Sequence, residues 1–233
     1  MTSSVSAIIW KELKSAKHRR KQIIVNSCSI FVFITIVAVA RLLGIKTTVG
    51  ITDTMAINMV IYISVTGTYM GLLALLRFWQ EKSNRTIETL LSLPIGTITI
   101  MLSKSVVPIL LGIIIGLIDA VAAAVIMSIL YNKLILSVAM FLAPVIFGIF
   151  VGIPYCFING YSMWCVSLTY SKLMQGISSI AYVALITVMF TNYNVHYMTI
   201  LKVVMGGAGI LFLLAIYFAY RVNKERIVLN LLD

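Results

Sequence analysis

The sequence predicts an all-α integral membrane protein. Six transmembrane helices are expected, with an N-terminal interfacial helix before them and a short cytoplasmic helix between the second and third spans. Hydrophobic residues make up 61% of the 233 residues and charged residues only 11%, whereas soluble domains carry about 25% charge. The mean hydropathy is +1.06. Six apolar runs each approach the ~20 residues that cross a bilayer, and they leave room for one transmembrane domain over residues 1–233 only.

The six predicted spans are joined by short connections. They cover residues 23–43, 55–78, 105–130, 137–160, 173–191 and 200–220. The stretch GYSMWCVSLTYSK, which begins at Gly160, is polar enough to predict a turn at the membrane face between the fourth and fifth spans. No outer connection is long enough to form a domain that captures a ligand.

Lysine and arginine predict the orientation. With the N-terminus inside, fourteen of the 18 basic residues fall on the cytoplasmic side and four outside, which are Arg41, Lys46, Lys133 and Lys202. Cytoplasmic loops carry such an excess. We therefore expect both termini in the cytoplasm, with residues 1–22 as an interfacial helix, 23–220 as the bundle and 221–233 as a tail. The net charge of +11 then needs no nucleic acid partner.

The segment before the first span has the pattern of a helix lying in the inner membrane interface. Within residues 5–18, apolar residues share one helical face and lysines occupy much of the other. Such a helix rests on acyl chains and holds its basic side near anionic headgroups. Trp10 suits this depth, and we expect Trp10, Lys11 and Lys14 at the membrane surface. A frayed basic tail is the alternative interpretation.

The stretch EKSNRTIETLLSLPI, residues 81–95, is a polar insert between two apolar runs. Thr86 suits the N-cap of a short helix, with Glu88 in its first turn, where the helix dipole favours an anion. Ile87, Leu90 and Leu91 share one face, and Pro94 ends the helix. We expect these apolar side chains to be exposed for docking to a partner. A helix that merely rests on lipid headgroups is the alternative.

This layout resembles the membrane subunit of the ABC type-2 transporter permease family. The resemblance spans the whole chain: Lys11-Glu12-Leu13 in the interfacial helix, six spans, and both ends inside. It is most specific in the loop after the second span, where family members often have glutamate, polar residues, Gly-Thr, glutamate, paired leucines and proline. The matching residues are Glu81, Thr86, Glu88, Leu90, Leu91 and Pro94, with Lys104 opening the next span. The chain departs from the pattern at Arg85, where glycine is common.

The resemblance implies that residues 81–95 form a coupling helix seated on an ATPase subunit. Glu81 and Glu88 would meet basic or backbone donors there, Thr86 and Pro94 would bound the helix, and Ile87, Leu90 and Leu91 would supply the buried contact. The chain contains no G-x-x-x-x-G-K-[ST] phosphate-binding loop. It would therefore bind no cofactor itself and be no enzyme. A partner ABC ATPase would hold ATP and Mg, and a second permease copy or a paralogue would complete the complex.

Asp119 lies near the middle of the third predicted span and is the single acid deep in any span. A carboxylate is costly in lipid, so Asp119 should face the bundle interior or a watery path. It is either part of a translocation path, as a contact for a cationic substrate or a protonatable site, or a hydrogen-bonding group between helices. Asn58, Thr66, Thr68 and Asn159 are its possible partners.

Small residues four positions apart predict close approach of the second, third and fourth spans. The pairs are Gly67 with Gly71, Gly112 with Gly116, and Gly148 with Gly152. Small residues allow helix backbones to come together in membranes. We therefore expect a compact bundle.

Two other classes of function remain open at this stage. A self-sufficient secondary transporter or channel needs no ATPase, but it ordinarily carries more ionisable groups or an internal repeat. An immunity or sensor protein would bind a peptide without pumping it. One aspartate is too little for an intramembrane enzyme. For an exporter, the size and apolar interior favour a peptide, such as an antimicrobial peptide, or another amphipathic cargo, and the composition favours a bacterial plasma membrane.

Overall fold

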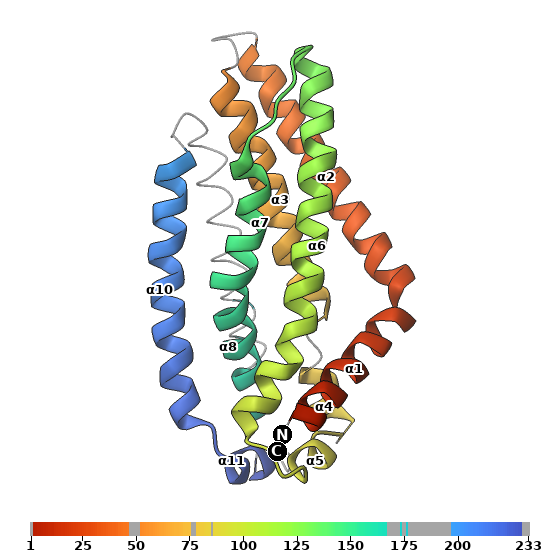
Figure 1. Cartoon of the computed structure of the whole chain (residues 1–233), viewed down its shortest axis with the longest axis vertical. Coiled ribbons are helices and arrows are strands. Elements are labelled where there is room, and N and C mark those ends of the chain that lie inside the picture. Colours follow the sequence, from red (N-terminus) through yellow and green to blue (C-terminus); the bar gives the residue numbers. More distant parts are fainter. Residues whose placement is uncertain are drawn as a thin grey trace.

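The computed structural model describes residues 2–46, 52–75, 78–84, 86–166, 173, 176 and 197–229. Helices make up nearly all of these residues (Figure 1). Their bounds are α1 Thr2–His18, α2 Arg20–Lys46, α3 Asp53–Leu75, α4 Phe78–Ser83, α5 Thr86–Leu91, α6 Thr97–Tyr131, α7 Val138–Phe150, α8 Gly152–Cys165, α10 Tyr197–Arg221 and α11 Lys224–Leu229.

The chain is an all-helical, multi-pass membrane protein. Within the described residues, five helical stretches are long and apolar enough to cross a bilayer: Arg20–Gly44, Asp53–Leu72, Thr97–Tyr131, Val138–Cys165 and Leu201–Arg221. They correspond to five of the six predicted spans. The other, at 173–191, lies outside the described residues apart from Leu173 and Gly176.

Helix α3 is the centre of the bundle, with 89% of its apolar stretch buried. It packs most closely on α6 because glycines face each other there. A Cβ atom on Gly71 would lie 2.7 Å from the Gly112 Cα, and one on Gly116 would lie 2.8 Å from the Ser64 carbonyl oxygen. The predicted close approach of these two helices is confirmed. By contrast, α2 and α10 bury only 11% of their apolar stretches and lie at the periphery.

Helix α6 begins earlier than the predicted third span, which started at 105. Its 35 residues correspond to about 52 Å at 1.5 Å per residue, whereas the hydrocarbon core is about 30 Å thick. The extra turns begin at Thr97 and include Lys104. Because Lys104 is charged, the predicted span began only after it. The extra turns extend the bundle into a polar end on which α1, α4, α5 and α11 gather (Figure 1). We call this the α5 end.

Three further boundaries differ from the predictions. Phe78 starts α4 rather than ending the second span. The fourth span consists of two helices, α7 and α8, which are separated at Val151. Pro154, in the first turn of α8, lacks the N–H that a continuous helix would use. Helix α8 then continues to Cys165. The turn that was predicted to begin at Gly160 is therefore wrong for residues 160–165, which are helical. Residues 161–165 are buried, and their packing inside the protein outweighs the polar composition of the stretch.

Candidate functional site

The insert forms the predicted short helix, but with its apolar face turned inward. Helix α5 spans Thr86–Leu91 and buries Ile87, Leu90 and Leu91. Ile87 is fully buried. The expectation that these side chains are exposed for a partner is therefore wrong. Burial against the rest of the chain removes this apolar surface from water without a second protein.

These three side chains belong to a hydrophobic cluster that joins six other elements at the α5 end. We call it the α5 cluster. Its buried members are Ile8, Phe78, Ile87, Leu90, Leu91, Ile95, Ile100, Met101, Phe157, Tyr161, Met163, Trp164, Cys165, Ala215 and Ile227. Because the members come from α1, α4, α6, α8, α10 and α11 as well as α5, the helix is fixed to the whole end of the bundle.

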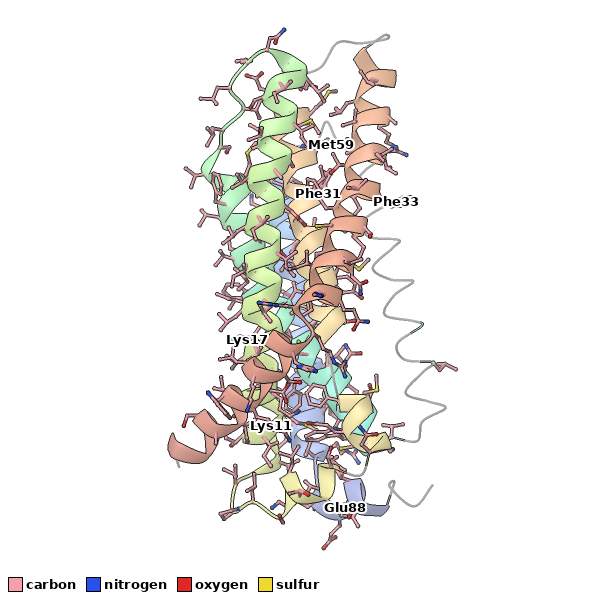
Figure 2. The ribbon with its side chains drawn as sticks, turned by 90° about the vertical axis from the view of Figure 1, so that its right-hand side faces the viewer. Lys11, Lys17, Phe31, Phe33, Met59 and Glu88 are labelled. Atoms are coloured by element: carbon pink, nitrogen blue, oxygen red, sulfur yellow. The ribbon has the colours of Figure 1, made fainter. Side chains whose placement is uncertain are left out.

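The opposite face of α5 is open. Thr86, Glu88 and Thr89 are exposed, as are Ser92 and Pro94 just after the helix. Figure 2 shows Glu88 at the extreme end of the molecule, pointing away from the bundle. Thr86 is the first helical residue rather than the predicted N-cap, and its hydroxyl donates to the Glu81 carbonyl oxygen at 3.5 Å. The surface available to a partner is therefore polar and centred on Glu88.

Glu81 lies inside the protein rather than on this surface. Its carboxylate accepts a hydrogen bond from the Lys104 ammonium, which also donates to Glu12 Oε1 at 2.5 Å. All three side chains are at least nine-tenths buried. We call this the Glu12–Lys104–Glu81 triad. It joins α1, α4 and α6, so Glu81 is turned into the chain, and its contact with a partner stays a prediction.

The triad is charged unevenly, with two carboxylates around one ammonium. Glu81 Oε2 has no hydrogen-bond partner among the described residues. Burial raises the pKa of the Glu81 carboxyl above its ordinary value, and the Lys104 ammonium acts in the opposite direction. Burial disfavours the charged form of an acid. The raised pKa indicates that this effect outweighs the ion pair at Glu81.

Helix α4 is held to α8 through aromatic and backbone contacts. The Trp164 indole N–H donates to the Phe78 carbonyl oxygen at 3.2 Å, and the two rings meet edge to face with centroids 5.1 Å apart. The Lys82 ammonium donates to the Val166 carbonyl oxygen at 2.9 Å. These contacts fix the segment before α5 in addition to the triad.

The segment after the last span is also part of the site, although it was expected to be a tail. The Lys224 ammonium donates to the Leu91 carbonyl oxygen at 3.0 Å and lies 3.4 Å from that of Leu93. A basic side chain at a helix C-terminus satisfies carbonyls that have no partner within the helix. Ile227 of α11 is fully buried in the α5 cluster. The C-terminal segment therefore clamps the end of α5.

Helix α1 has an inner and an outer face, but the inner face meets protein. It differs from the predicted apolar face because Glu12 is buried and Leu13 is 48% exposed. Ile8 is buried in the α5 cluster, and α1 packs on α6. Trp10 is 62% exposed, and the Lys14 ammonium lies 5.1 Å from the centre of its ring. Lys11 and Lys14 are exposed as well. The residues predicted for the membrane surface are thus on the outside of the protein.

Asp119 is buried where α6 meets α3. A Cβ atom on Gly67 would lie 1.8 Å from the Asp119 Oδ2 atom, so the carboxylate occupies the space that glycine leaves. Three of the proposed partners are engaged elsewhere: Thr66, Thr68 and Asn159 donate to carbonyl oxygens of their own helices. The contact with Gly67 fits the interpretation in which Asp119 faces a neighbouring helix, and its part in a translocation path stays a prediction.

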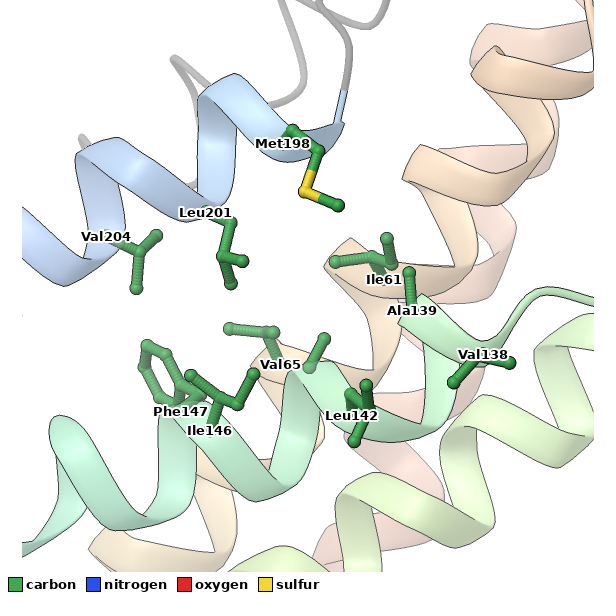
Figure 3. A pocket seen from close by; sticks show the side chains of 11 residues that line it. Ile61, Val65, Val138, Ala139, Leu142, Ile146, Phe147, Met198, Leu201 and Val204 are labelled. Carbon is green, nitrogen blue, oxygen red and sulfur yellow. The ribbon is translucent and has the colours of Figure 1, made fainter.

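An apolar cavity of about 280 Å³ lies between α3, α7 and α10 (Figure 3). Ile61 and Val65 of α3, Phe147 of α7, and Leu201 of α10 are among the residues that line it. All of its lining side chains in the described part of the chain are apolar. It suits a hydrocarbon group. Over the described residues, no three His, Cys, Asp or Glu side chains gather to hold a metal ion.

Comparison with known proteins gives no relative for this chain: no family model, no curated protein and no solved structure matches it.

Proposed function

We propose that this chain is the permease subunit of an ATP-binding cassette exporter. In this proposal it forms the translocation path with a second copy or a paralogue. Separate ATPase subunits bind ATP and Mg and seat on the α5 end. The chain itself is then no enzyme. The single observation that carries the proposal is that α5, a short helix fixed by the α5 cluster and by Lys224, presents an exposed polar face centred on Glu88.

A coupling element must pass a push from a partner to the spans, and the contacts of α5 suit this task. Helix α4 is tied to α6 by the triad, and α5 is tied through Lys224 to α11, which follows α10. A force that a partner applies at Glu88 is therefore passed both to α6 and to α10. A connection that only joined two spans would need a few residues and no such anchoring.

The distribution of charge supports a cytoplasmic location for the α5 end. The exposed surface of α1 and the start of α2 carries Lys11, Lys14, Lys17, Arg19, Arg20 and Lys21. The far end of the bundle has an exposed Asp53–Lys133 pair at 2.6 Å and few other charges among the described residues. Under the positive-inside rule this excess supports the proposal that the α5 end, with α1 and α11, lies on the cytoplasmic side of the plasma membrane.

The class of cargo is inferred from the apolar cavity. The cavity between α3, α7 and α10 has an apolar lining, which suits the apolar groups of a peptide or another amphipathic compound. We therefore assign a peptide or amphipathic cargo to the exporter.

Co-purification tests the proposal. Tagged chain is isolated from its native cells in mild detergent, and the proteins that accompany it are identified by mass spectrometry. We expect an ATPase in about equal amounts with the wild-type chain and its loss with Glu88→Lys, because that change reverses the charge on the exposed face. Lys133→Glu, a charge reversal at the opposite end, is the matched control. A chain that comes out alone or only with itself would favour a self-sufficient transporter or channel.

A further inference from the structure

The junction of α1 and α2 forms a bent, strongly basic surface. Helix α1 ends at His18 and α2 starts at Arg20, and the two helices run in different directions (Figure 1). Between Lys11 and Lys21 every basic side chain is exposed. Figure 2 shows two of them, Lys11 and Lys17, along the outside of α1. We call this surface the elbow.

The elbow lacks negative charge because its one acid is turned inward. Glu12 is buried and bound to Lys104 on the other side of α1. Glu81, the next acid in the α5 end, is buried in the same triad. Among the described residues, no ion pair joins the basic side chains of the elbow to a carboxylate. Their summed positive potential is directed outward.

The elbow is also hollowed. Trp10 and Leu13 line the hollow together with basic side chains of both helices, among them Lys14, Lys17 and Arg20. Trp10 and Leu13 are 62% and 48% exposed. An indole and a leucine exposed beside lysines form a surface with both apolar and cationic parts. This combination suits an amphipathic anion better than an inorganic one.

The position of the elbow along the chain sets its depth in the membrane. The apolar stretch of α2 begins at Arg20 and is mostly unburied, with Ile24 and Val25 exposed one turn further on. Side chains that face lipid one turn after Arg20 put the hollow at the level of the headgroups. Indole rings and basic side chains are both favoured at that depth.

We propose that the elbow is a binding site for the headgroup of an anionic phospholipid. The phosphate lies in the hollow among Lys14, Lys17 and Arg20, and Trp10 and Leu13 contact the upper part of the acyl chains. The proposal requires that the chain spans a membrane and is independent of the exporter assignment.

Lipid retention measured by native mass spectrometry tests this proposal. The full chain is purified in detergent and titrated with phosphatidylglycerol or phosphatidylcholine of the same acyl chains. The elbow variant is Lys14→Gln/Lys17→Gln/Arg20→Gln, and the control is Arg41→Gln/Lys133→Gln/Lys202→Gln, which removes equal charge. We expect wild type and control to prefer phosphatidylglycerol, and the elbow variant to bind it on the order of 100-fold more weakly. Thermal unfolding in detergent without lipid verifies that both variants are folded.

Two further measurements separate the alternatives. High salt should weaken phosphatidylglycerol binding to the wild type, because screening acts on exposed charges. Equal binding of both lipids, or an elbow variant that matches the control, would overturn the proposal. Binding of inorganic phosphate as tight as that of the lipid would assign the elbow to a soluble anion instead. Loss of a co-purifying protein with unchanged lipid binding would make the elbow a protein interface. None of these results depends on Glu88.

Discussion

The Lys104 ammonium lies 2.5 Å from Glu12 Oε1, although the two residues are 92 positions apart in the chain. The same ammonium binds Glu81 on a third helix. One cation therefore joins the interfacial helix, the segment before α5 and the base of the longest span. The triad explains why a charged residue is tolerated inside α6, since a buried charge persists where it is paired.

Removal of the cation is expected to disrupt this end of the protein. Lys104→Met leaves two buried carboxylates without a counter-charge, and breaking a buried pair in this way costs about 3–5 kcal/mol. Unfolding of the purified chain by titration with a denaturing detergent measures the loss. Lys133→Met is the matched control, because its pair with Asp53 is exposed on both sides and such pairs contribute about 0–1 kcal/mol. Equal losses in the two variants would contradict the role given to the triad.

Glu81 predicts a dependence of stability on pH. Because burial raises its pKa in the folded chain above the ordinary 4.5, the folded state binds the proton more tightly than the unfolded state. The resulting stabilisation is complete below the ordinary pKa and is lost as pH rises through the folded-state pKa. We expect the wild type to lose stability as the pH rises above about 4.5 and through the folded-state pKa. Glu81→Gln, which stays neutral, should lose less and be at least as stable at pH 7.

The measurement is the unfolding midpoint of both proteins across this range. Glu88→Gln is the control, since Glu88 is exposed and its replacement should leave the slope unchanged. A Glu81→Gln protein with the wild-type slope would show that another group titrates.

The contact between Gly67 and Asp119 predicts a rescue. Gly67→Ala places a Cβ atom 1.8 Å from Asp119 Oδ2, and overpacking of this kind costs about 1–3 kcal/mol. In Gly67→Ala/Asp119→Ala the carboxylate is gone, and the Cβ of residue 119 lies 3.4 Å from the new Cβ of residue 67. Most of the lost stability should therefore be recovered. The wild type, Gly67→Ala, Asp119→Ala and the double variant form a double-mutant cycle, in which the free energy of unfolding of each protein is measured. Gly207→Ala, with open space around it, should not destabilise, and additive losses at Gly67 and Asp119 would contradict the contact.

The sequence was sufficient to predict the elements of the site but not their contacts. The spacing of Ile87, Leu90 and Leu91 predicted both the helix and its apolar face, because a helical period is local. It did not indicate what covers that face. The answer depends on Trp164, Ile227 and other residues brought in by the tertiary fold.

The triad shows the same limit for charge. Glu12, Glu81 and Lys104 each resemble surface residues when judged by their neighbours in sequence, and their pairing exists only once α1, α4 and α6 meet. One signal was available: Lys104 follows ITIMLS and precedes a long apolar run. A lone cation at the edge of a span calls for a partner within the protein, and nearby acids at polar–apolar boundaries are the candidates.

Lys224 makes a prediction about local rather than global stability. Its ammonium donates to the Leu91 carbonyl oxygen, so Lys224→Met removes one contact that holds the last turn of α5, at a cost of about 1 kcal/mol. The amide of Ser92, which donates to the Glu88 carbonyl oxygen, should then exchange with solvent roughly fivefold faster, because the open state gains population by that factor. Hydrogen–deuterium exchange of peptides that cover 86–95 measures this, with Lys202→Met at the far end as control. Protection unchanged from the wild type would mean that α11 holds α5 through Ile227 alone.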